Sequence, residues 1–142
     1  MLAKSPQPTD DPMLYAVFCY NEEADIQQWT PAEDAACMER LLAAQAPFEA
    51  AGRLGPVGRL DFTGTATTLR KGSGDPVVHD GPFAETKEQL LGFYVIEAAS
   101  MEEVQDFARN LAHADPGKGS YEIRPLRYLK PAGEEFRMEH AS

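Results

Sequence analysis

The hydrophobic pattern of the chain begins with an almost unbroken apolar run. Residues 14–20 are nearly all apolar or aromatic, which predicts a central strand that is covered on both faces. Residues 1–12 before it contain three prolines and show no periodicity, which predicts a flexible lead-in. We therefore expect a single domain over 13–130, followed by a polar C-terminal tail over 131–142.

Two later segments carry the signals that start and stop helices. The first, Thr30-Pro31-Ala32-Glu33, is a capping box with proline at the first helical position, and it predicts a helix that ends at Gly52. Pro47 lies inside this helix and removes a backbone donor, so we expect a kink near it. The second, residues 100–103, is another capping box, followed by apolar residues at helical spacing: Val104, Phe107, Ala108 and Leu111.

The remaining apolar segments predict strands. They lie at 53–61, 64–70, 76–79, 92–96 and 121–128, with a turn at 71–75 between the second and third. This order predicts the α+β class and a ferredoxin-like βαββαβ fold with an additional β-hairpin. Helices cover only one face of such a sheet, and the first strand predicts that the other face is apolar. We therefore expect a second copy to cover it in a homodimer.

The segment from Val78 to Tyr94 combines turn residues, charges and an aromatic residue ahead of a strand. Asp80-Gly81 is a turn pair, and Pro82 fixes the backbone so that Phe83 is carried to a defined place. Phe83 either packs in the core and holds the loop to the sheet, or forms the wall of a cleft and stacks on a small ligand. The sequence leaves both alternatives open.

The run from Asp80 to Ile96 resembles the signature of the DGPF proteins, which belong to the YCII-related family. This resemblance implies a fold of the dimeric α/β barrel superfamily for residues 13–130. It also implies an association with sigma factors of the extracytoplasmic-function type, through protein contacts. The wider family resembles a group with a candidate acid/base histidine and aspartate in the N-terminal half. This chain departs from that pattern, because it has no histidine before His79.

Composition narrows the classes of function. The chain has 142 residues, of which 43% are hydrophobic and 25% charged, as is typical of globular proteins. Its formal net charge of −10 argues against direct nucleic-acid binding. The sequence shows no apolar run long enough for a membrane span and no signal-peptide pattern, which predicts a cytoplasmic protein. Cys19 and Cys37 fit neither a disulfide framework nor a redox motif, and we interpret them as small buried hydrophobes.

Asp80 and Glu85 are the candidate catalytic residues. Two carboxylates near an apolar pocket can be driven to different protonation states and divide the roles of acid and base. The alternative is that Asp80 hydrogen-bonds its own turn and that Glu85 lies in water. The three histidines, His79, His113 and His140, do not have metal-ligand spacing, so we expect neither a metal nor a cofactor.

The candidate ligand-binding residues lie on the expected strands and on the loop after Asp80. An arginine that faces a cleft can hold a carboxylate in a bidentate grip, and a lysine can anchor an anion, although solvated surface roles are commoner for both. Glycines allow the backbone to approach a ligand closely. The candidates are Arg59, Arg70, Asp80, Gly81, Phe83, Lys87 and Gly92, with Arg53 as a further arginine on the expected strands.

Two hypotheses of function follow. The first is a homodimer that binds a small polar or anionic metabolite and serves as a sensing or accessory protein, with the link to sigma-factor-dependent transcription that the resemblance implies. The second is a small cofactor-independent acid/base enzyme of isomerase, lyase or oxygenase type that uses Asp80 or Glu85, which rests on fold analogy.

Overall fold

The computed structural model describes residues 12–136. Its elements in chain order are β1 (Met13–Glu22), α1 (Glu23–Ile26), α2 (Pro31–Ala50), β2 (Leu54–Arg59), the 3-10 turn η1 (Thr63–Thr65), β3 (Thr67–Arg70), β4 (Val77–Asp80), β5 (Glu88–Ala98), α3 (Met101–Ala114) and β6 (Gly119–Pro125). The expected lead-in therefore lies outside the described residues apart from residue 12. The same is true of tail residues 137–142, which include His140.

Four strands form an antiparallel sheet in the order β2-β5-β1-β6, and β3 and β4 form a separate two-stranded sheet. With α2 and α3 this is the ferredoxin-like α+β fold that the sequence predicts, and β3–β4 is the additional hairpin. Pro125 ends the edge strand β6, where a missing backbone donor is tolerated. The segment at 53–61 pairs with β5, so it belongs to the main sheet and not to the hairpin.

The first predicted helix is confirmed as α2. Thr30 Oγ1 accepts from the backbone N–H of Glu33 at 3.1 Å, and the Glu33 carboxylate accepts from the N–H of Thr30 at 2.8 Å. The helix continues through Pro47 to Ala50. Gly52 then adopts φ 73°, a left-handed conformation that favours glycine after a helix end.

The second predicted helix is confirmed as α3, but its capping box is only half formed. Ser100 Oγ accepts from the N–H of Glu103 at 3.2 Å. The Glu103 carboxylate does not complete the box at Ser100; it accepts from the N–H of Ala99 at 2.8 Å and from Arg53 at 2.6 Å. The nearby guanidinium explains this choice, since a charged donor forms the stronger hydrogen bond.

The core lies between the sheet and the two long helices. Alternate residues of β1 and β5, namely Tyr15, Val17, Tyr94 and Ile96, are buried against Val104, Phe107 and Leu111 of α3. The Phe107 ring makes edge contacts with the rings of Phe48 and Tyr94, at centroid distances of 5.0 and 5.4 Å. The apolar stripe that marks α3 in the sequence is therefore the centre of the core.

The opposite face of the sheet, which we call the open sheet face, is apolar at its centre and polar at one edge. Ala16 lies opposite Val95 and Phe18 opposite Phe93; Ala16 and Val95 are 6% and 8% exposed, and the two phenylalanines are half-buried. On the neighbouring edge strand β6, exposed polar side chains continue the same face: Ser120, Glu122 and Arg124.

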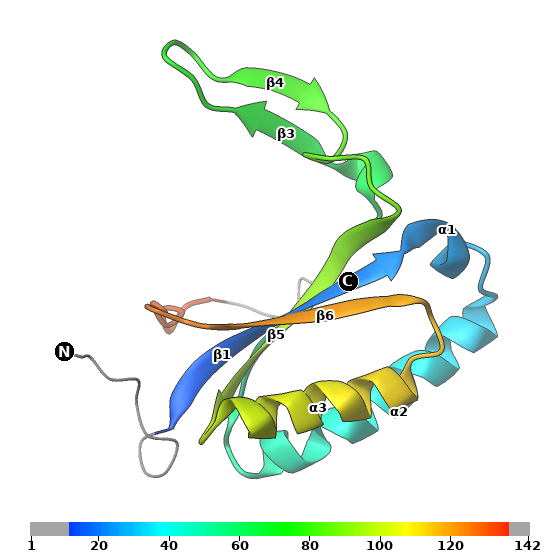
Figure 1. Ribbon diagram of the computed structural model, residues 1–142, viewed down its shortest axis with the longest axis vertical. Coiled ribbons are helices and arrows are strands. Elements are labelled where there is room, and N and C mark those ends of the chain that lie inside the picture. The colour runs from blue at the N-terminus through cyan, green and yellow to red at the C-terminus, as the bar shows by residue number, and fades with distance from the viewer. Residues whose placement is uncertain (1–11, 137–142) are drawn as a thin grey trace.

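Residues 63–87, which we call the arm, stand away from this body. Figure 1 shows the helices on one side of the sheet and the arm leaning out over the other side, above the open sheet face. Within the described part of the chain, no helix is long and apolar enough to cross a membrane.

Candidate functional site

The signature loop, residues 80–87, is the second half of the arm and contains most of the candidate site residues. Gly81 adopts φ 106°, donates its N–H to the carbonyl of Ala66 at 2.8 Å, and accepts from Thr68 Oγ1 at 2.8 Å. The turn predicted at Asp80-Gly81 is therefore present, and it closes on the hairpin. A side chain at residue 81 would be strained at this φ.

Phe83 is not part of the core of a single subunit. Its residue surface is 74% exposed, the second highest value among the large hydrophobic residues of the described chain. The core alternative for Phe83 is therefore wrong for the subunit alone. An aromatic side chain held in water by a fixed turn gains most when a ligand or another protein surface covers it.

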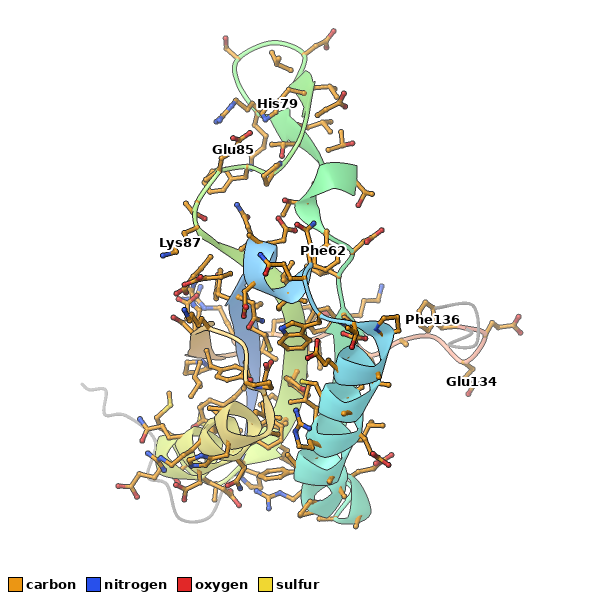
Figure 2. The ribbon with its side chains drawn as sticks, turned by 90° about the vertical axis from the view of Figure 1, so that its right-hand side faces the viewer. Phe62, His79, Glu85, Lys87, Glu134 and Phe136 are labelled. Carbon is orange, nitrogen blue, oxygen red and sulfur yellow. The ribbon has the colours of Figure 1, made fainter. Side chains whose placement is uncertain are left out.

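Asp80 and Glu85 are both exposed on the arm. Figure 2 shows Glu85 and His79 on the upper part of the molecule and Lys87 below them, where the arm joins the sheet. Carboxylates divide acid and base roles when burial or a neighbouring charge distinguishes them. Within one subunit, water surrounds both carboxylates.

The base of the arm is tied firmly to the body. The Glu23 carboxylate accepts from both the backbone N–H and the hydroxyl of Thr63, at 2.5 and 2.6 Å. Lys87 pairs with Glu22 across 3.7 Å on the other limb of the arm. Gln89 Nε2 donates to the carbonyl of Ala84 at 2.9 Å and steadies the loop. The arm is thus fixed at its root, while β3 and β4 have no other strand partner within residues 12–136.

The two arginines of the β2 segment already have intramolecular partners. Arg59 forms a bidentate pair with Asp34 of α2, at 2.6 and 3.2 Å, and this hydrogen bonding lowers the pKa of the Asp34 carboxyl. Arg53 bonds Glu103 at 2.6 Å and lies 4.8 Å from the centroid of the Phe48 ring. The bidentate grip expected for a ligand is therefore made by Arg59 with Asp34 of α2, while Arg53 forms a single hydrogen bond with Glu103 of α3.

Arg70 and Gly92 lie apart from these pairs. Arg70 is exposed at the end of β3, opposite Val77. Gly92 lies inside β5, where an added Cβ would be 2.9 Å from the carbonyl oxygen of Gly58. Its missing side chain is thus used for close approach by β2, so the structure brings together Asp80, Gly81, Phe83 and Lys87 on one loop and leaves Arg59 and Gly92 in the body.

The body contains a polar group formed by Cys19, Gln45 and Tyr94, and of these the sequence predicts burial only for Cys19. Cys19 lies opposite Tyr121 on the helix-covered face, and Gln45 Nε2 donates to the hydroxyl of buried Tyr94 at 3.5 Å. Burial raises the pKa of Cys19 and of Tyr94 to about 12, with the Asp115 charge adding to the effect. The Cys19 thiol is therefore protonated at neutral pH and is a poor nucleophile. For Tyr94, the alternation of β5 was the signal that the sequence offered.

Cys37, His79 and His113 are the remaining cysteine and histidine side chains within residues 12–136. Cys37 is buried, as expected, and burial raises its pKa to about 11. His79 is half-buried on the arm, and His113 is exposed in the last turn of α3. Among residues 12–136, no three histidine, cysteine or acidic side chains are grouped so that they could hold a metal ion.

The fold and the loop define a class of protein: a ferredoxin-like domain whose helices lie on one side of the sheet, with a projecting hairpin that leads into a DGPF turn. The family model for the YCII-related domain matches residues 13–130, and the chain belongs to this family. It is also similar to an uncharacterized protein of Rhizobium meliloti (strain 1021). That protein is 56% identical over 119 residues, which cover 84% of this chain and 96% of the relative.

Proposed function

We propose that the protein works as a homodimer whose two open sheet faces pack together, and that this dimer binds a small polar or anionic metabolite beside the signature loop. The observation that carries the proposal is the composition of the open sheet face. Its centre is apolar, with Ala16, Phe18, Phe93 and Val95 in register, and its β6 edge is polar. An apolar centre with a polar rim is the usual anatomy of a protein interface.

The metabolite part of the proposal rests on the arm. Phe83 offers an aromatic surface, and Arg70 and Lys87 are exposed cations that are not held in a close bidentate pair. Facing sheets of a dimer would bring a second body toward the arm, which leans over the open sheet face (Figure 1). A ligand could then be enclosed between subunits, where its polar groups are bound away from water.

The accessory role rests on the resemblance to DGPF proteins associated with sigma factors. The net charge of −10 fits contact with a protein better than contact with DNA. Under this proposal, the purified dimer co-elutes with a purified sigma factor of the extracytoplasmic-function type.

One substitution tests the dimer and the ligand together. Phe18→Lys places a cation opposite Glu122 on the neighbouring strand, so a cross-strand ion pair can form in the single subunit. In a packed dimer the same lysine would be buried, which is costly. The matched control is Leu42→Lys, which changes an exposed apolar residue of α2.

Light scattering at micromolar concentration should give twice the 15.6 kDa subunit mass for the wild type and for Leu42→Lys, and one subunit mass for Phe18→Lys. A thermal-shift screen with small carboxylate and phosphate metabolites should then find a compound that stabilises only the dimeric forms. A monomeric wild type would contradict the dimer, and a dimer that no compound stabilises would contradict the metabolite role.

A further inference from the structure

We propose that the arm is an intersubunit clasp, which packs its apolar side chains against a second copy of this chain. This inference rests on the proposed dimer and deepens it, because it assigns part of each candidate site to the partner subunit. The juxtaposition behind it is an arm with four exposed large hydrophobic residues that leans over an apolar sheet face: Leu69, Val77 and Val78 of the hairpin, and Phe83 of the signature loop.

The arm lacks a core of its own. Leu69 and Val78 are directly opposite each other on one face of the hairpin, and Val77 lies on the other face opposite Arg70. Apolar side chains therefore point into water from both faces. An isolated two-stranded hairpin is marginally stable at best, so this one needs a surface to pack on.

The exposed area suits a second copy. The four residues are between 57% and 74% exposed. With about 150 Å² for each residue, the low end of the range for aromatic side chains, they present roughly 400 Å². Two arms would present about 800 Å² and cover a similar area on their partners, which together reach the roughly 1,600 Å² of a stable interface.

The charge of the arm also favours a second copy. Residues 63–87 contain three basic and three acidic side chains: Arg70, Lys71, Lys87, Asp75, Asp80 and Glu85. The formal net charge of −10 is therefore carried wholly by the rest of the chain. Two such bodies repel each other, and a neutral apolar arm is the part of the chain that approaches the partner without this repulsion.

The position of the arm is compatible with contact to a second copy on the open sheet face. Packed sheets lie about 10 Å apart, so a second sheet on the open sheet face would enter the space over which the arm leans (Figure 1). Glu23 and Thr63 fix the root of the arm, which limits the conformational freedom lost when it closes on a partner. Asp80, Phe83 and Glu85 of one subunit would then face the body of the other.

The test compares an arm variant, Leu69→Ser combined with Phe83→Ser, with Leu42→Ser on α2, because Leu69 and Leu42 are both 57% exposed. Dimer dissociation is measured by sedimentation across a dilution series of the full chain. Leu69→Ser combined with Phe83→Ser should raise the dissociation constant by about tenfold or more, while Leu42→Ser should leave it within about twofold. Circular dichroism checks that each variant is folded.

Phe18→Lys separates this inference from the proposed sheet-to-sheet dimer. If Phe18→Lys dissociates the dimer and the arm variant does not, the clasp is wrong and the sheet dimer stands. If the arm variant dissociates the dimer and Phe18→Lys does not, the arm holds the subunits together but packs on a surface other than the open sheet face. Hydrogen exchange gives a second measurement: the β3 and β4 amides should lose protection on dilution, and unchanged protection would overturn the clasp.

Discussion

The body and the arm contain the same kinds of apolar residue and use them in opposite ways. In the body, the apolar side chains of α3, β1 and β5 bury one another, and Phe107 is 2% exposed. In the arm, Leu69 and Val78 are paired across two strands but remain exposed. The difference shows that local pairing forms the hairpin, while burial requires a layer that one subunit does not supply.

The body and the arm therefore differ in what they contribute to the protein. The body has what a folded domain needs: capped helices, a buried core and ion pairs between elements. The arm has a fixed root, a defined turn and exposed apolar side chains, which are features typical of a binding surface. Substitutions in the body should therefore change the stability of the subunit, and substitutions in the arm should change association.

The largest effect is expected in the core. Phe107→Ala removes a ring that contacts Phe48 and Tyr94 and leaves a cavity. The free energy of unfolding should fall by about 3–5 kcal/mol in urea denaturation. Phe83→Ala is the matched change on the arm. Measured in the Phe18→Lys background, which is designed to disrupt the proposed dimer, it should change the same quantity by less than about 0.5 kcal/mol. Similar losses for both phenylalanines would refute the contrast between body and arm.

A smaller effect is expected from adding one methyl group. A Cβ at Gly119, the first residue of β6, would collide with the carbonyl of Tyr20 in the neighbouring backbone. Gly119→Ala should therefore cost about 1–3 kcal/mol of unfolding free energy. Gly72, near the tip of the arm, has no atom within 4 Å of an added Cβ. Gly72→Ala should change stability by less than about 0.5 kcal/mol. Equal melting temperatures for the two variants would show that β6 is as loosely held as the arm.

The sequence predicted the body well because its signals are local. The capping box at Thr30, the apolar spacing of α3 and the run in β1 each specify one element without reference to the rest. The family resemblance identified from the Asp80 to Ile96 run is confirmed by the family model. The short helix α1 was missed because a single turn has too few residues for a periodic pattern.

The candidate site was harder to predict from the sequence because the residues that interact there are distant in the chain. Arg59 and Asp34 are 25 residues apart and Arg53 and Glu103 are 50 apart, so their pairing depends on how α2 and α3 pack on the sheet. Burial of Tyr94 and Gln45 likewise follows from how β5 and α2 pack and not from composition. The chemistry of Asp80 and Glu85 depends on whether a second subunit covers the arm, and the catalytic role therefore stays a prediction.

The smallest effect concerns the ion pair that joins the entry to β2 with α3. Arg53 and the N–H of Ala99 hold the pKa of the Glu103 carboxyl below its ordinary value. A depressed folded-state pKa stabilises the fold above the unfolded value of about 4.3, and this contribution is lost as the pH falls through the folded value. Glu103→Gln should thus cost about 1 kcal/mol at pH 7 and almost nothing near pH 2.

Lys87→Gln is the control at the root of the arm. Lys87 is 3.7 Å from Glu22, and its side chain is largely exposed, so its loss should cost less than about 0.3 kcal/mol at pH 7. Thermal unfolding of both variants and the wild type from pH 2 to 7 measures the difference. If Glu103→Gln loses as much stability at pH 2 as at pH 7, the charge of Glu103 contributes nothing to stability and only the shape of its side chain matters. The contact of Arg53 with Glu103 would then stabilise the body through packing and not through charge.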